Sequence, residues 1–214
     1  MTTAAPPPAG SATMARLKAE TADLHQAAET SQFQRALVKG ELAPAAYAAW
    51  LGQMLLIHDA LEGALREARA ASPALAQVDR REYDRADDLR SDLVDLAADP
   101  DNVEPLGATS RLCDAIGSSD ALGLLGMRYV LEGSNNGNRF IAAAIRRAMP
   151  DAPTRYLDPY GESQRSRWAA FREDMERNGF GPDEQDQLVA AARLMFKGVG
   201  ELSRELAGRT LGGA

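Results

Sequence analysis

Apolar side chains recur at helical intervals along almost the whole of this chain. Between residues 44 and 70 they lie three or four positions apart, the spacing that gathers them on one face of an α-helix: Tyr47, Trp50, Leu51, Met54, Leu55, His58, Leu61 and Leu65. Pro44 suits the first turn of such a helix. No stretch shows the strict alternation typical of a strand, so the pattern predicts an all-α protein.

Further helices are predicted on both sides of this one, each bounded by a residue type that caps or breaks helices. Their expected spans are residues 13–29, 79–97, 119–150, 163–177 and 182–206. Ser11 or Thr13 is expected to cap the first helix, and residues 33–38 to form a short turn. A single domain of six to eight helices follows, over residues 13–207. The prolines near the start predict a disordered tail at residues 1–12, and a flexible tail is expected at residues 208–214.

Two glycines, Gly133 and Gly137, interrupt the predicted helix over residues 119–150. Each costs about 1 kcal/mol relative to alanine inside a helix. Because they are four residues apart, they lie on one face and leave a groove where another group can reach the backbone. Ser134, Asn135 and Asn138 add polar groups to the same turn. Such a helix is either kinked for packing or kept thin for a flat ligand.

Composition narrows the classes of function. The formal net charge of -7 argues against a nucleic-acid surface, and no apolar run reaches the roughly 18 residues of a membrane helix. The single cysteine, Cys113, has no internal disulfide partner, so a reducing cytoplasm is expected. The sequence has neither the Cys/His clusters of zinc sites nor the Glu-x-x-His repeats of di-iron bundles.

The chain has two histidines. His58 lies on an apolar stripe, which favours a packed core residue. His25 lies beside its stripe, with Glu29 one turn further on and Lys18 two turns back. This set is either a solvated face with an ion pair, or an imidazole ligand oriented by a carboxylate, with a cation placed for an anionic ligand group. One such histidine, a glycine groove and scattered cations favour a flat, anionic, metal-bearing cofactor, and haem fits that description.

Three segments resemble a known family, the haem oxygenases. Residues 17–29, LKAETADLHQAAE, resemble the first helix of these proteins. Residues 129–137, YVLEGSNNG, resemble the distal helix of the bacterial members, and residues 57–62, IHDALE, are similar to their counterpart. The resemblance covers about residues 14–206. It implies a haem-oxygenase-like helical bundle in which a kinked, glycine-containing distal helix covers the haem.

The resemblance also implies roles around the haem iron and propionates. His25 matches the proximal iron ligand, and Glu29 matches the carboxylate that engages its imidazole. Lys18 and Tyr129 match residues that meet the propionates, and Arg172 is similar in placement to a basic residue with that role. Taken alone, Lys18 and Arg172 are also compatible with solvated charges, and Tyr129 with a core aromatic residue.

On the distal side, Gly133 and Gly137 match the glycines that let the helix flex over the haem, and Ser134 and Asn135 match positions that shape the pocket and its waters. One position departs from the family. Asn138 stands where many relatives have a second Gly or Ala. Its longer side chain is expected to narrow the pocket, hydrogen-bond a distal water or point away.

The activity implied by the family is oxidative cleavage of haem, as both substrate and cofactor, to biliverdin, CO and Fe2+. The partners implied are haem, O2, an external electron donor (a reductase or ferredoxin) and a bilin acceptor such as a phytochrome. Two other classes stay open. One is a non-catalytic haem carrier or sensor on the same fold. The other is a different enzyme on a similar helical fold, such as a thiaminase-like protein, which two histidines and one cysteine support poorly.

Overall fold

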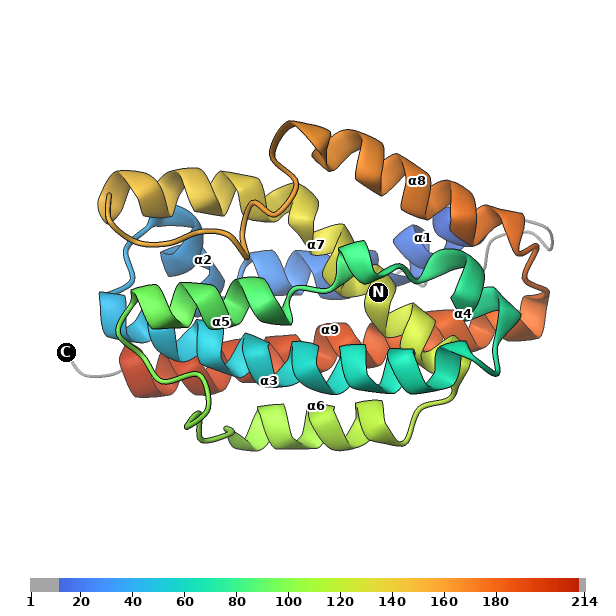
Figure 1. Cartoon of the computed structure of the whole chain (residues 1–214), viewed down its shortest axis with the longest axis horizontal. Helices are drawn as coiled ribbons and strands as arrows, with labels where there is room; N and C mark the ends of the chain where they lie inside the picture. The colour runs from blue at the N-terminus through green and yellow to red at the C-terminus, as the bar shows by residue number, and fades with distance from the viewer. Residues whose placement is uncertain (1–11, 212–214) are drawn as a thin grey trace.

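The computed structural model describes residues 12–211, and within that range the chain forms helices and loops with no strand (Figure 1). Nine α-helices are found there instead of the predicted six to eight: α1 (Thr13–Glu29), α2 (Gln32–Lys39), α3 (Pro44–Arg69), α4 (Pro73–Val78), α5 (Ala86–Asp95), α6 (Gly107–Gly117), α7 (Ala121–Ala148), α8 (Gln164–Arg177) and α9 (Pro182–Thr210). Two short 3₁₀ turns are η1 (Arg81–Tyr83) and η2 (Gly161–Ser163). The all-α class is confirmed, and residues 1–11 and 212–214 of the predicted tails lie outside the described range.

The longest helices enclose one apolar core. Helix α9 packs along both α1 and α7, and α3 lies between α5 and α6 (Figure 1). Leu55 of α3, Leu125 of α7 and Met195 of α9 are fully buried in this core. At Gly126 the backbones of α7 and α9 come so close that a Cβ atom would clash with the carbonyl oxygen of Leu188.

The first turn of α1 is capped from another helix. Ala12 precedes α1 and offers no side-chain cap, Thr13 is already helical, and Ser11 lies outside the described residues. Instead, the backbone N–H groups of Thr13 and Met14 donate to the carboxylate of Glu176 on α8, each at 3.0 Å. The predicted cap is therefore wrong for Thr13, and a remote carboxylate satisfies the free N–H groups.

The predicted helix over residues 79–97 is also wrong in its first half. Helix α5 begins only at Ala86, because the 3₁₀ turn η1 and the extended residues Arg80 and Asp84 on either side of it come first. Glu62 on α3 accepts hydrogen bonds from the backbone N–H groups of Arg85, at 2.7 Å, and Ala86, at 3.2 Å. The buried Glu62 carboxylate thus sets the start of α5, a role that a local sequence pattern does not show.

Three short helices were not predicted. Residues 33–38, expected to form a turn, belong to α2, whose N-cap residue Ser31 accepts from the N–H of Gln34. Helix α4 follows directly after the break at Ser72. Helix α6 begins at Gly107, where the carboxylate of Glu205 accepts from backbone N–H groups. At the other end of the chain, α9 runs to Thr210, past the predicted end at residue 206.

Helix α7 is continuous through both glycines. It spans Ala121–Ala148, close to the predicted residues 119–150, and Asp120 caps it by accepting from the N–H of Gly123. In Figure 1 its C-terminal half leaves the line of its N-terminal half, so the helix bends without breaking. The second half of α7 runs above α2, with which α7 is in contact (Figure 1).

Candidate functional site

Tyr129 of α7 is the point where three helices of the predicted site meet. Its hydroxyl hydrogen-bonds to the side chain of Thr21 on α1, and burial raises its pKa. Its ring lies 6.0 Å from the indole of Trp168 on α8. Arg172 on α8 is near enough for its charge to act on the Tyr129 hydroxyl, and Lys18 lies one turn before Thr21. Tyr129 and Arg172 therefore come together, with Lys18 on the adjoining turn of α1.

Both cations are available to an anion. Lys18 and Arg172 are exposed, and neither forms an ion pair with any of residues 12–211. Arg177, five residues further along α8, is instead engaged by Glu173 and Asp174, at 2.6 Å each. Near Tyr129, therefore, Lys18 and Arg172 have no acidic partner among the described residues.

His25 lies one turn after Thr21 and is 60% exposed. Its Nδ1 is 3.6 Å from Oε1 of Glu29, within ion-pair range but longer than a normal hydrogen bond. The ring edge meets Phe196 of α9 at 5.9 Å between ring centroids. Its Nε2 makes no hydrogen bond to the described part of the chain. The predicted pairing of His25 with Glu29 is present, and one ring nitrogen stays open.

His58 lies in the core, as its apolar stripe predicted. It is 2% exposed, and its Nδ1 is 3.0 Å from Oε1 of Glu62. Burial lowers the pKa of His58. Cys113 is similarly inert: its thiol donates to the carbonyl oxygen of Leu56, and burial raises its pKa. Neither residue fits an exposed ligand or a reactive nucleophile.

The glycine-containing turn of α7 has an open face. A Cβ atom at Gly137 would meet nothing within 4 Å, and Ser134, one turn earlier, is exposed. Gly133 is different, because a Cβ there would lie 3.4 Å from the indole of Trp168. The two glycines thus have separate surroundings: Trp168 covers Gly133, and Gly137 stays uncovered.

Helices α1 and α7 separate beyond the contact of Thr21 with Tyr129. They do not otherwise pack closely, and from there α1 and the second half of α7 extend toward the same end of the bundle (Figure 1). His25 follows Thr21 on α1, and Gly137 follows Tyr129 on α7. The side chain of His25 is 60% exposed and a Cβ atom at Gly137 would meet nothing within 4 Å, so both positions are open to solvent.

A groove of about 810 Å³ lies on the α9 side of this region. Its wall includes Leu24 and Ala28 of α1 and Phe196 of α9, the residue whose ring meets His25. Its volume suits a small-molecule ligand. None of the predicted site residues lines this groove, so it adjoins the predicted site through Phe196 and does not coincide with it.

A buried polar chain that the sequence analysis missed starts at the same turn. The Nδ2 group of Asn138 donates to Oγ of Ser134 and Oδ1 of Asn135, both at 3.4 Å. Asn135 in turn donates to Oε2 of Glu132 at 3.3 Å, and the Tyr160 hydroxyl donates to the same oxygen at 3.1 Å. Burial raises the pKa of Glu132 to about 7. The available signal was a glutamate among the apolar residues just before the glycine turn, one turn after Arg128.

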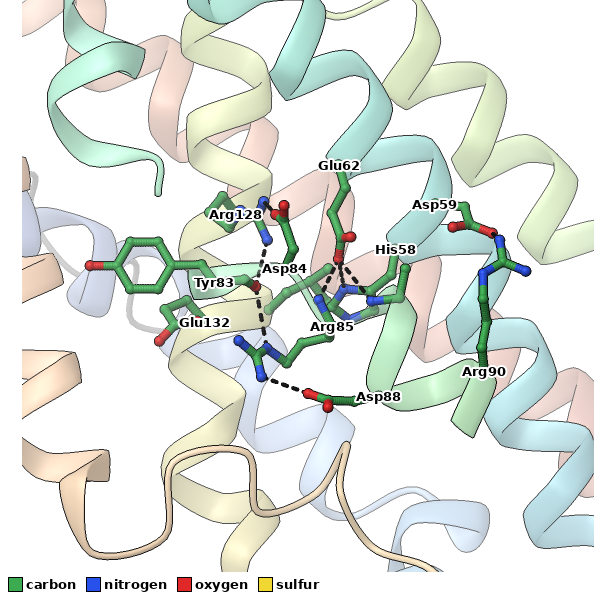
Figure 2. A network of polar contacts seen from close by, with 12 residues as sticks. His58, Asp59, Glu62, Tyr83, Asp84, Arg85, Asp88, Arg90, Arg128 and Glu132 are labelled. Atoms are coloured by element: carbon green, nitrogen blue, oxygen red, sulfur yellow. Dashed lines mark hydrogen bonds and ion pairs between the residues drawn. The ribbon is translucent and has the colours of Figure 1, made fainter. Parts of the chain in front are cut away.

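Behind this chain lies a buried set of ion pairs (Figure 2). The guanidinium of Arg128, 1% exposed, donates to Asp79 at 3.1 Å and to Asp84 at 2.8 Å. The guanidinium of Arg85 lies 4.9 Å from the ring centre of Tyr160. These charges fix the loop between α4 and α5 against α7, next to Glu132.

Two features are absent from residues 12–211. No group of three or more His, Cys, Asp or Glu side chains is arranged to hold a metal ion there. None of the helices in that range is long and apolar enough to cross a membrane.

Fold and site together define an all-α protein with an exposed histidine on one helix and an uncovered glycine turn on another. A family model described as "Heme oxygenase" matches residues 11–205. The chain therefore belongs to the haem oxygenase family. Comparison with curated proteins gives no match.

Solved structures support the fold. Haem oxygenase-1 from the cyanobacterium Synechocystis, in complex with haem, is 18% identical over 94% of this chain and 95% of that one, with a TM-score of 0.85. The haem oxygenase of Leptospira interrogans is 20% identical over 91% of this chain and 99% of that one, with a TM-score of 0.83. A CADD-like protein of unknown function from Nostoc punctiforme is 15% identical over 92% and 99%, with a TM-score of 0.59.

Proposed function

We propose that this chain binds haem between α1 and the glycine-containing turn of α7, and cleaves it with O2 to biliverdin, CO and Fe2+. One observation carries the proposal. His25 and Gly137 are open to solvent on two helices that are joined at Thr21 and Tyr129. Membership of the haem oxygenase family supports it, as does the haem bound in the similar Synechocystis structure.

The residues present fit haem. His25 has an exposed imidazole with an open Nε2 to bind the iron, and Glu29 is placed to accept a hydrogen bond from Nδ1. A ligand nitrogen is held in the required tautomer by such a partner. Gly137 leaves room for a flat ring, since a Cβ atom there would meet nothing within 4 Å.

The remaining side chains orient the substrate and move protons. Lys18, Tyr129 and Arg172 would pair with the propionates, which fixes the rotation of the ring in its plane and so the edge presented to oxygen. On the opposite side, Ser134, Asn135 and Asn138 would shape the pocket and hold its water. Haem itself, when bound and reduced, supplies the oxygen chemistry.

Electrons must come from outside the chain in this proposal, because the sequence contains no flavin or nicotinamide motif. We propose a reductase or a ferredoxin as donor, and a bilin-binding protein such as a phytochrome as one acceptor of the product. The unpaired Cys113 suits a reducing compartment, which we take to be the cytoplasm.

A spectrum after addition of hemin, followed by reductant in air, tests the proposal. We expect a histidine-ligated haem spectrum that is replaced by the absorption of biliverdin. The second candidate is a non-catalytic haem carrier or sensor on the same fold, which this chain shares with a CADD-like protein of unknown function. Stable haem binding without bilin formation, with ascorbate and with a reductase, would favour the carrier and contradict the enzyme.

A further inference from the structure

The hydrogen bonds at the glycine turn form a series in which each side chain donates to the next, from Asn138 through Asn135 to Glu132. Its buried end is the carboxylate of Glu132, 2% exposed, whose Oε2 accepts from Tyr160 and from Nδ2 of Asn135. With Nδ2 of Asn135 held there, its Oδ1 faces Asn138 and accepts from that amide. The Asn138 amide also reaches Ser134, which is exposed on the open face.

Each link depends on the one before it. An amide has a donor end and an acceptor end, so the acceptor at Glu132 decides which way Asn135 points. That choice decides which end of the Asn138 side chain is engaged and which is left for a group outside the helix. The second carboxylate oxygen, Oε1, is buried with no partner among the described residues.

Charged and titratable groups from every neighbouring element act on this carboxylate. Arg128 on α7 and Arg85 ahead of α5 favour its charged form, and so does the hydrogen bond from Tyr160 in the loop before η2. Burial opposes them and is the largest effect, giving a pKa of about 7. Tyr83 in η1 lies close enough for the Glu132 charge to raise the tyrosine pKa, and both are labelled in Figure 2.

We propose that Glu132 is a positioning residue for the distal side of the site: its carboxylate orients Asn135, Asn135 orients Asn138, and protonation of Glu132 releases both amides. This inference rests on the proposed function only in that the oriented amide serves a small ligand bound at the glycine turn. A protonated carboxyl binds the Asn135 amide more weakly than a carboxylate, because charge-assisted hydrogen bonds are roughly twice as strong as neutral ones.

The side-chain amide signals of Asn135 and Asn138 in the ¹⁵N-labelled full chain without haem test the proposal directly. We expect both signals to shift together between pH 5.5 and 8.5, with one midpoint near pH 7. In Glu132→Gln, which keeps an acceptor oxygen but cannot titrate, both shifts should be lost while the helical circular dichroism is retained. Glu67→Gln, an exposed glutamate on α3, is the matched control and should leave both titrations unchanged.

Asn135→Ala provides a second variant that leaves Glu132 intact. Because Asn135 is the middle link, the Asn138 signal should stop titrating in this variant. Wild-type amides that do not titrate, or a titration that persists in Glu132→Gln, would overturn the proposal whether or not the protein cleaves haem.

The haem-loaded full chain gives a separate readout. The pH profile of bilin formation should have a step near pH 7 in the wild type and lose it in Glu132→Gln; a step retained in the variant would also overturn the proposal. If the wild type bound or cleaved no haem while the amides titrated as expected, the proposed function would fail and the orienting role of Glu132 would stand.

Discussion

The Tyr129 hydroxyl hydrogen-bonds to the Thr21 side chain, and this contact ties the helix of the predicted iron ligand to the glycine-containing helix. His25 lies one turn beyond Thr21, and Gly133 lies one turn beyond Tyr129. This contact joins two helices that both pack along α9.

Removal of the His25 side chain should abolish histidine ligation of haem without unfolding the protein. His25 is 60% exposed and its ring touches only the edge of the core at Phe196, so His25→Ala should keep the wild-type melting temperature within about a degree or two, as expected of an exposed substitution. Its Soret band should shift, and bilin formation should cease. An unchanged Soret band in this variant would contradict the assignment.

His58→Ala is the matched control on the second histidine. It removes the partner of a buried carboxylate, since Nδ1 of His58 lies 3.0 Å from Glu62. The free energy of unfolding should fall by about 1–3 kcal/mol, as measured by urea denaturation. The haem spectrum should keep its histidine ligation, and loss of ligation in a folded His58→Ala protein would point to the wrong histidine.

The double variant Lys18→Ala, Arg172→Ala should change how haem is held. Neither cation has an acidic partner in the described structure, so stability should change little. Loss of a charge-assisted hydrogen bond to a propionate should weaken haem binding by roughly 1.5–3 kcal/mol or alter the ratio of biliverdin isomers. Arg177→Ala, on the same helix but paired with Glu173 and Asp174, should affect neither.

Gly137→Leu should block haem or oxygen binding while the chain stays helical. A side chain here enters space that holds no atom within 4 Å of the Cβ position, and leucine is a better helix former than glycine by about 0.5–1 kcal/mol. Gly126→Ala supplies the contrast, because its Cβ would clash with Leu188 and should destabilise the fold. Wild-type haem turnover in Gly137→Leu would contradict a role for this glycine in the haem site.

The stability of the protein should depend on pH through Glu132. Burial raises its pKa from 4.5 to about 7, so between these values the folded state holds a proton that the unfolded state has released. The free energy of unfolding is therefore not reduced by Glu132 below pH 4.5. It falls as the pH rises from 4.5 to 7, by about 3 kcal/mol at most. Urea denaturation of Glu132→Gln should show less loss than the wild type between pH 5 and pH 8. An equal loss in both proteins would mean that Glu132 does not titrate in this range.

Hydrophobic periodicity alone determined the all-α class and most of the long helices. The stripe from Tyr47 to Leu65 predicted α3, and the breaks around residues 119–150 predicted α7 to within two residues at each end. These elements follow from the sequence because the residues that form, cap and end them are neighbours in the chain. The motifs around His25 and Gly133 likewise pointed to the family that the comparison then showed.

Only the tertiary structure decided where the shorter helices begin and which polar groups are buried. Glu176, Glu62 and Glu205 cap α1, α5 and α6 from other helices, and their distance along the chain hides them from any local pattern. The same holds for Glu132, which looks like an ordinary helix residue in the sequence. Its burial and its hydrogen bond from Tyr160, in a distant loop, appear only in the structure. The pKa of a carboxyl group depends on how far the surrounding residues exclude water from it. Those residues come from segments that are far apart in the sequence.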